Sequence, residues 1–334
     1  MSPHINLTQF IVKQQRTNPQ STGDLSGLIN DIASACKEIS HLVNRSGIMG
    51  IGGVAESENV QGEVQKELDI ITNDVMVNHL NWTGHLAAMA SEEIEEIIQI
   101  PKQFPKGKYL ITFDPLDGSS NIDINLSVGT IFSILRCPDG VTEPTEATFK
   151  QKGIEQVCAG FCVYGPTTML IITTGNGVDG FTLDQDVGEF ILTHPKMTIP
   201  EDTNEFAINM SNQRFWEESV QRYINECMQG VDGGRDKNFN MRWVASMVAE
   251  VYRVLTRGGI FLYPIDNKPL TEGGKLRLMY EASPMSFIVE QAGGISSTGR
   301  ERIMEITPEG VHQRVPVILG SKNEVERIIS YHQD

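Results

Sequence analysis

The sequence predicts an α/β or α+β fold built from two sub-domains. Segments with the spacing of amphipathic helices alternate with short apolar runs typical of strands along the whole chain. The length of 334 residues leaves room for two units with substantial cores. A polar stretch over residues 193–204, which contains Pro195 and Pro200, is the candidate boundary. We therefore expect an N-terminal sub-domain over residues 1–198 and a C-terminal sub-domain over residues 199–334.

The elements expected in the first sub-domain begin with two helices. Apolar side chains recur every three or four positions in residues 24–43, and residues 67–80 also favour a helix. Residues 139–153 are polar and irregular, which indicates a surface loop. Short apolar runs bounded by turn residues predict strands over residues 86–90, 108–113, 130–136, 157–164 and 168–174.

The second sub-domain is expected to mix helices and strands in the same way. Residues 244–255 favour a helix, and residues 322–331 favour a closing helix. Apolar runs predict strands over residues 259–263 and 315–319 and continue the mixture at 276–280 and 287–291.

The composition is that of an ordinary soluble protein, with 40% apolar and 21% charged residues. No apolar run reaches the length of a membrane span, and the N-terminus lacks the pattern of a secretory signal. The five cysteines are scattered and show no zinc-ligand spacing, which favours reduced thiols. Cys158 and Cys162 share one face of an expected strand at a spacing too long for a disulfide. We expect a cytoplasmic protein that binds no membrane.

The formal net charge of −16 argues against a nucleic-acid partner, since the chain has no run rich in lysine and arginine. The same charge repels a phosphate ester on average. A phosphorylated ligand would therefore need local cations, backbone N–H groups and metal ions. The sequence offers candidates for all three.

The most informative motif is the acidic turn from Phe113 to Asn121. Asp114 follows an apolar run, Pro115 favours an extended residue before it, and Gly118 allows a tight turn. Asp114 and Asp117 can point at one spot, and carboxylate and carbonyl oxygens suit Mg²⁺. The N–H groups just beyond can hold a phosphate against that metal. The alternative is an ordinary Asp-Pro turn with capping serines.

Other acidic residues have weaker signals when taken alone. Glu92 and Glu93 follow an apolar run, but acidic residues are also common in the first turn of a helix. Asp69, with Glu63 before it, can equally belong to a solvated helix face, and Glu281 follows the strand-like run 276–280.

Together these elements resemble class I fructose-1,6-bisphosphatase, a family of the lithium-sensitive, metal-dependent sugar phosphatases. The resemblance covers nearly the whole chain, from residues 22–25 to residues 316–321. It implies a layered α-β-α-β-α fold. Its markers are Ser91-Glu92-Glu93, the string from Phe113 through Asp123, and residues 127–132, 188–192, 258–264 and 274–278.

The resemblance implies which residues hold metal ions and activate water. Two or more Mg²⁺ ions per subunit, for which Mn²⁺ can substitute, would be held by Glu92, Asp114, the Leu116 carbonyl, Asp117 and Glu281. Glu93 and Asp69 would activate the attacking water. Glu63 stands where the family often has Asp, so it keeps the charge on a longer side chain.

The resemblance also places the substrate. The reacting phosphate would lie at Asp117, Gly118, Ser119 and Ser120. The other phosphate and the sugar would be held by Asn209, Asn212, Arg242, Trp243, Met247, Tyr263 and Lys275. Trp243 and Asn212 depart from the family's frequent Tyr, and neither can supply a phenol hydroxyl. Arg242 is expected to reach in from a neighbouring subunit, which implies a homo-oligomer, in the first instance a tetramer.

A regulatory AMP site is implied as well. Its contacts would be Thr22, Asp24, Leu25, Ser26, Lys108, Tyr109 and Arg136. The alternative for residues 22–26 is a plain helix cap.

The leading function is hydrolysis of fructose 1,6-bisphosphate to fructose 6-phosphate, a step of gluconeogenesis. A dual activity that includes sedoheptulose 1,7-bisphosphate is the first alternative. An inositol-monophosphatase-like activity fits less well, because Asn209, Arg242 and Lys275 imply a second phosphate. A non-catalytic sugar-phosphate sensor is the alternative from another class, and the intact set of acidic residues argues against it.

Overall fold

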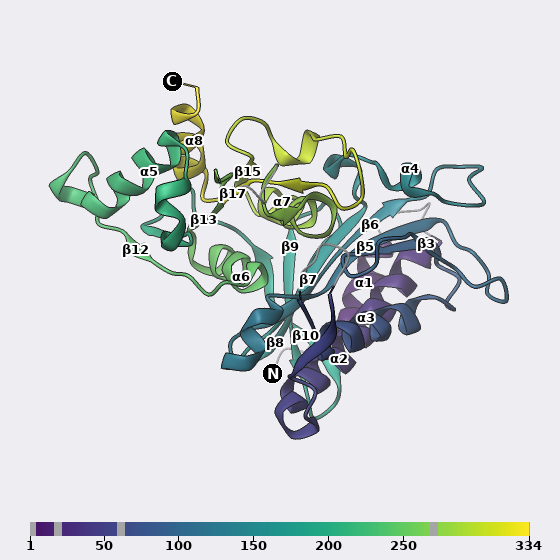
Figure 1. Ribbon diagram of the computed structural model, residues 1–334. Coiled ribbons are helices and arrows are strands. Elements are labelled where there is room, and N and C mark those ends of the chain that lie inside the picture. The colour runs from purple at the N-terminus through teal and green to yellow at the C-terminus, as the bar shows by residue number, and fades with distance from the viewer. Residues whose placement is uncertain (1–4, 17–21, 59–63, 268–272, 334) are drawn as a thin grey trace.

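The computed structural model describes residues 5–16, 22–58, 64–267 and 273–333. Two sheets and the helices around them form its framework (Figure 1). The larger sheet has eight strands in the order β10-β9-β8-β7-β6-β5-β3-β4, and only β3 and β5 pair in parallel among them. These strands are β3 (Leu86–Ser91), β4 (Ile98–Gln99), β5 (Tyr109–Asp117), β6 (Val128–Arg136), β7 (Cys158–Tyr164), β8 (Thr168–Thr173), β9 (Val178–Asp184) and β10 (Glu189–Met197).

The smaller sheet has five strands in the order β12-β11-β13-β17-β15. Here β11 pairs in parallel with both of its neighbours, and β17 pairs antiparallel with β13 and β15. Two short two-stranded pairs, β1–β2 and β14–β16, complete the strands of the described residues. The bounds are β1 (Val54–Glu58), β2 (Val64–Lys66), β11 (Glu205–Ala207), β12 (Asn240–Met241), β13 (Ile260–Tyr263), β14 (Leu276–Arg277), β15 (Ile295–Ser297), β16 (Arg314–Val315) and β17 (Val317–Gly320).

Helices separate and cover the two sheets, which gives the layered α-β-α-β-α arrangement. Three helices cover one face of the larger sheet, two lie between the sheets, and two cover the far face of the smaller sheet. In that order they are α1 (Leu7–Gln15), α2 (Asp24–Met49), α3 (Glu67–Leu80), then α6 (Met247–Arg257) and α7 (Ser283–Gln291), then α5 (Glu218–Gln229) and α8 (Lys322–Tyr331). The fold is therefore the mixed α/β class with two sub-domains that the sequence predicted.

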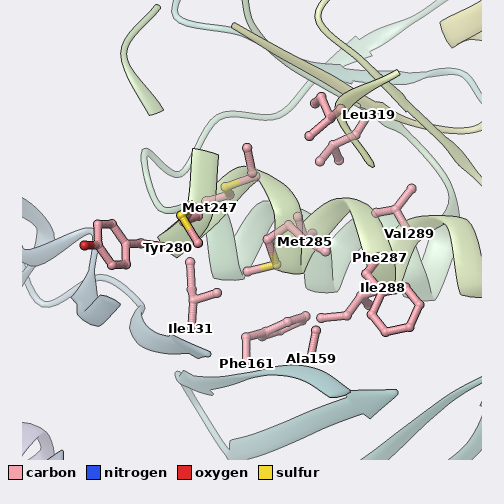
Figure 2. Close-up of a cluster of buried hydrophobic side chains, with 14 of the residues drawn as sticks. Ile131, Ala159, Phe161, Met247, Tyr280, Met285, Phe287, Ile288, Val289 and Leu319 are labelled. Atoms are coloured by element: carbon pink, nitrogen blue, oxygen red, sulfur yellow. The ribbon is translucent and has the colours of Figure 1, made fainter. Parts of the chain in front are cut away.

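The central strands β6, β7 and β8 are largely apolar because both of their faces are buried. On β7, Phe161 faces the core around α7, whereas Cys162 faces the core around α2. Figure 2 shows how Met285 and Ile288 of α7 fill the space above Phe161. All five cysteines are free and buried, as expected of packed thiols. No helix of the described residues is both long and apolar enough to cross a membrane.

Several expected elements have the bounds that the sequence predicted. Helices α3 and α8 match residues 67–80 and 322–331, and α2 extends the expected helix to Met49. The strand expected over residues 108–113 continues to Asp117, because Pro115 lies at a shift of register against β6 where no ladder N–H is required.

Two expectations of local structure are wrong. Residues 276–280 do not form one strand, since β14 ends at Arg277 and a wide helical turn, η5 (Leu278–Ala282), leads into α7. This run is buried throughout, so its pattern does not distinguish strand from helix. Within the polar stretch 139–153, α4 (Glu146–Phe149) forms around the buried Phe149. The candidate boundary over residues 193–204 begins within β10, which ends at Met197.

Candidate active site

A cavity of about 430 Å³ lies where the acidic turn meets residues from the second half of the chain. Its floor comes from the end of β5 and from η5. Its sides come from η1 (Ser119–Ile124), the start of α6, and strands β13 and β14. The cavity therefore collects residues that are more than a hundred positions apart in the sequence.

Three buried carboxylates form the floor. Asp114, Asp117 and Glu281 each offer an oxygen within 4.8 Å of the others. Leu116 N–H donates to Asp114 Oδ1 at 2.9 Å, and Arg277 N–H donates to Glu281 Oε2 at 2.6 Å. A hydrogen bond of 2.9 Å from Thr112 Oγ1 to the Met279 carbonyl holds η5 against β5. This is why Glu281 reaches Asp114 from another part of the chain.

Burial and the closeness of the three carboxylates disfavour their negatively charged forms. Burial and the neighbouring acids Glu92, Asp117 and Glu281 raise the pKa of Asp114 well above its usual range. Burial first, and then Glu92, raises the pKa of Glu281 to about 8. Burial likewise raises the pKa of Asp117 to about 6. A divalent cation among the three would relieve both the burial and the repulsion, so the residues fit a metal.

The other predicted acids lie around this floor. Glu92 lines the cavity, and one of its oxygens lies 2.8 Å from Arg277 Nη1. Glu93 also lines it and is half-buried. Asp69, on the first turn of α3, accepts the Lys66 N–H at 2.8 Å. Burial, offset in part by that hydrogen bond, raises the pKa of Asp69 to about 7. Glu63 lies outside the described residues.

A helix start faces the floor from above. Gly118 adopts a left-handed conformation with φ of 74°, and η1 begins at the next residue. A Cβ on Gly118 would come within 2.7 Å of Ser246 Cβ, so the turn requires glycine for space as well as for its backbone angle. Gly118, Ser119 and Ser120 all line the cavity, where free N–H groups at a helix start suit a phosphate.

Three aromatic residues and a lysine also line the cavity. Trp243 stacks on Phe261 with ring centres 6.1 Å apart, and its ring centre lies 6.0 Å from that of Tyr263. Lys275 Nζ lies 5.7 Å from the Tyr263 ring centre. These four residues also line the cavity together with Asn209 and Met247. The cavity thus combines a cluster of buried acids with a cation and an aromatic cluster.

Two residues expected at the sugar end do not line this cavity. Asn212 borders a small neighbouring hollow of about 10 Å³, beside Asn209 and Tyr263. Arg242 is half-exposed, and its Nε lies 3.7 Å from Glu205 Oε1 on the same chain. Within one subunit, therefore, Arg242 remains outside the cavity.

The cavity also contains residues that the sequence reasoning missed. Arg277 is buried next to Glu92 and Glu281, and Ser246 Oγ donates to Asp117 Oδ2 at 2.9 Å. The available sequence signal for Arg277 was its place in the marker 274–278, two residues after Lys275. The full set missed is Lys66, Ala245, Ser246, Phe261, Leu276 and Arg277.

The residues expected to contact AMP cluster at the start of α2, and none of them lines the cavity. Lys108 Nζ donates to Thr22 Oγ1 at 2.6 Å and lies 2.7 Å from Asp24 Oδ2. The Arg136 guanidinium lies 5.6 Å from the Tyr109 ring centre. Leu25 packs partly buried on the core beneath, and Ser26 Oγ donates to Gln15 Oε1 of α1 at 2.9 Å.

The buried acids of this cavity fit the site of a metal-dependent phosphatase. Family models agree with this class. The model described as Fructose-1-6-bisphosphatase, N-terminal domain, matches residues 5–195, and the model of the C-terminal domain matches residues 199–333. The chain belongs to the fructose-1,6-bisphosphatase family, and it is a phosphoric monoester hydrolase.

Individual relatives lead to the same family. A class 1 fructose-1,6-bisphosphatase of Halorhodospira halophila is 58% identical over 331 residues, which are 98% of each chain. The crystal structure of Leishmania major fructose-1,6-bisphosphatase in holo form is 39% identical, with a TM-score of 0.93 over 99% of each chain. The T-state of that enzyme is 38% identical, with a TM-score of 0.88 over 99% of each chain.

Proposed function

We propose that this enzyme removes the 1-phosphate of fructose 1,6-bisphosphate with Mg²⁺, giving fructose 6-phosphate and phosphate in gluconeogenesis. The observation that carries the proposal is the chemistry of the cavity lining. Three clustered, buried carboxylates line the same cavity as Lys275, whose Nζ lies 5.7 Å from the ring centre of Tyr263, and Trp243 lines it as well. A sugar with a phosphate at each end suits that arrangement.

The acidic residues of the cavity would have two roles, metal binding and activation of water. Asp114, Asp117 and Glu281, with Glu92 and the Leu116 carbonyl, would hold the metal ions. Bound Mg²⁺ would supply neutralisation of the phosphoryl charge and acidification of water. Asp69, whose pKa burial raises to about 7, is suited to accept a proton from water near neutral pH, with Glu93 beside it.

The remaining groups bind and orient the substrate. N–H groups at Gly118, Ser119 and Ser120 would hold the reacting phosphoryl group. Lys275 would pair with the phosphate that does not react, and Met247 would pack against the sugar. These contacts position the ester for attack and supply the local positive field that a chain of net charge −16 otherwise lacks.

Regulation, assembly and location belong to the same proposal. AMP would bind at the start of α2, where Lys108 and Arg136 provide cations for its phosphate. The active form would be a homotetramer in which Arg242 acts on the neighbour's substrate. Five free cysteines favour the cytoplasm.

One assay tests the core of this proposal. Phosphate release is measured from fructose 1,6-bisphosphate and from sedoheptulose 1,7-bisphosphate, with Mg²⁺ and with a chelator. We expect Mg²⁺-dependent release, faster from the fructose ester. Equal release from both substrates would establish the dual activity, which the missing phenol at Trp243 favours. Binding without any release would instead support a sensor.

The matched variant is Lys275→Ala. Because Lys275 would hold a phosphate that does not react, its contribution is mostly uniform binding, so KM should rise about tenfold or more while kcat changes little. A kcat defect at unchanged KM would show that Lys275 has another role.

A further inference from the structure

A short segment connects the sugar end of the cavity to its acidic floor. We call residues 242–247 the strap; it leads from β12 into α6. Four of its residues, Trp243, Ala245, Ser246 and Met247, line the cavity, while Val244 does not. We propose that Asn121 and Glu250 are positioning residues, which clamp the strap at Val244 and thereby fix the aromatic wall relative to the metal-binding carboxylates. The proposal rests on the proposed function of this cavity.

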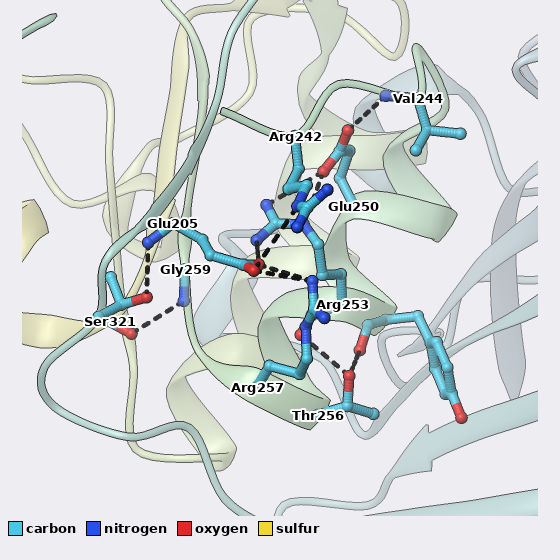
Figure 3. A network of polar contacts seen from close by, with 11 residues as sticks. Glu205, Arg242, Val244, Glu250, Arg253, Thr256, Arg257, Gly259 and Ser321 are labelled. Carbon is cyan, nitrogen blue, oxygen red and sulfur yellow. Dashed lines mark hydrogen bonds and ion pairs between the residues drawn. The ribbon is translucent and has the colours of Figure 1, made fainter. Parts of the chain in front are cut away.

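Both polar groups of the Val244 backbone are held from opposite sides. Val244 N–H donates to Glu250 Oε1 at 2.7 Å (Figure 3), and the Val244 carbonyl accepts Asn121 Nδ2 at 2.8 Å. Asn121 Nδ2 also donates to the Ser127 carbonyl at 3.2 Å. Asn121 ends the acidic motif and Glu250 lies on α6, so the clamp joins the two halves of the chain.

The Glu250 carboxylate is itself anchored by arginines. Its side chain is 0% exposed, and Arg253 Nη2 donates to its Oε2 at 3.1 Å. Arg253 Nη1 donates at 3.0 Å to Glu205, which Arg257 also contacts at 2.8 Å (Figure 3). The contact with Arg253 fixes the orientation of the Glu250 carboxylate, so its other oxygen stays aimed at the Val244 amide.

The strap needs such a clamp because its next residue is strained. Ala245 has φ of 60°, in the left-handed region that favours glycine. A non-glycine residue adopts this conformation at a cost in free energy and persists there only where its neighbours are held. On the far side of Ala245, Ser246 Oγ and Val248 N–H donate to Asp117 Oδ2 at 2.9 and 3.0 Å. Releasing Val244 would let Trp243 and Ser246 move together.

Neither clamp residue touches the cavity, so substrate contact does not explain them. A positioning role predicts a specific kinetic result. Asn121→Ala and Glu250→Ala should each raise KM for fructose 1,6-bisphosphate about tenfold, with a smaller loss of kcat. Glu250→Gln keeps an oxygen that can accept the Val244 N–H, so it should restore KM to within about threefold of wild type.

The control for general damage is Glu324→Gln. Glu324 is another buried glutamate paired with an arginine, since Arg235 Nη2 donates to it at 2.7 Å, and it lies away from the cavity. Thermal unfolding of all variants measures the loss of stability. The control should lose stability and keep KM. If the clamp variants lose stability and also keep KM, their role is structural only and the proposal is wrong.

A second readout needs no substrate. The chain has three tryptophans, at positions 82, 216 and 243, so Trp82→Phe with Trp216→Phe leaves Trp243 alone. In that background, Asn121→Ala and Glu250→Ala should increase acrylamide quenching of Trp243 fluorescence, and Glu324→Gln should not. Unchanged quenching in both clamp variants would overturn the clamp. A wild-type chain that releases no phosphate would overturn the proposed function, and the quenching result would still decide the clamp.

Discussion

Three carboxylates, those of Asp114, Asp117 and Glu281, are buried close to one another. Negative charge on them opposes folding, because it is removed from water and repelled by its neighbours. The hydrogen bonds from Leu116, Ser246 and Arg277 use only part of their oxygens and fix the direction in which the rest point. Such an arrangement costs stability and is retained where function requires it. At the scale of single residues, the site is therefore preorganised for a cation.

Removing one of these charges should abolish catalysis without unfolding the protein. Asp114→Asn and Glu92→Gln each remove a proposed metal ligand, which should cost several kcal/mol of transition-state stabilisation, or about a thousandfold in kcat/KM or more. The measurement is phosphate release with Mg²⁺, accompanied by circular dichroism to verify the fold. Near-normal turnover in either variant would contradict the metal assignment.

The pH dependence of stability should report the same repulsion in the metal-free enzyme. The Glu281 pKa is about 8 in the folded protein against an ordinary value of 4.5, so between those values the folded state binds the extra proton. Its contribution to stability is present at low pH and is lost as the pH rises toward 8. Glu281→Gln removes this slope, so the variant should gain in Tm relative to wild type at pH 8 more than at pH 5.

That comparison is made by calorimetry in a chelator and is repeated with Mg²⁺. The metal should raise the Tm of wild type most at pH 8, because it replaces the proton. Parallel curves of Tm against pH for wild type and Glu281→Gln would contradict the assignment of this slope to Glu281.

At the scale of elements, hydrophobic spacing along the chain predicted the helices and strands that form from local sequence alone. The run of β5 and the periodicity of α2 were sufficient to place both. The extension of β5 past Pro115 was not predictable, because it depends on the pairing with β6. Helix α5 was missed, although Val220, Ile224 and Cys227 recur at helical spacing.

The residues that line the cavity also fall into two groups, those that a local motif predicts and those that only the tertiary structure identifies. The acids of the motif were found because carboxylates at a turn have a chemical signature. Phe261 was missed because an aromatic residue inside an apolar strand has none. The contact between Arg277 and Glu92, at 2.8 Å, depends on the tertiary structure, so the sequence alone did not predict it.

The start of α2 allows a test of AMP control at this scale. Lys108 already pairs with the Asp24 carboxylate at 2.7 Å, so a nucleotide phosphate has to displace that like charge. Lys108→Ala should weaken AMP inhibition and Asp24→Asn should strengthen it, each by a factor of about 5 or more. AMP is titrated against all three proteins at saturating substrate. Insensitivity of the wild type would show that residues 22–26 form only a helix cap.

At the scale of the whole molecule, one subunit does not supply every predicted contact. The cavity of this chain contains Lys275, but Arg242 lies outside it and is half-exposed, with its Nε 3.7 Å from Glu205 Oε1. An exposed pair of that length contributes about 0–1 kcal/mol, so the guanidinium is easily released to another anion. A neighbour's phosphate would be such an anion.

Mixed oligomers test this sharing directly. Arg242→Ala subunits keep the acidic floor, and Asp114→Asn subunits keep the guanidinium, so each preparation alone should have little activity. After the two are mixed, dissociated and reassembled, an interface between unlike subunits would create a site with Asp114 from one and Arg242 from the other. We expect phosphate release well above the sum of the separate preparations, in a species that sediments as a tetramer. A mixture of two Asp114→Asn preparations is the control and should gain nothing. Full activity of a wild-type monomer in the ultracentrifuge would exclude a shared site, because a single chain would then contain every group that the reaction needs.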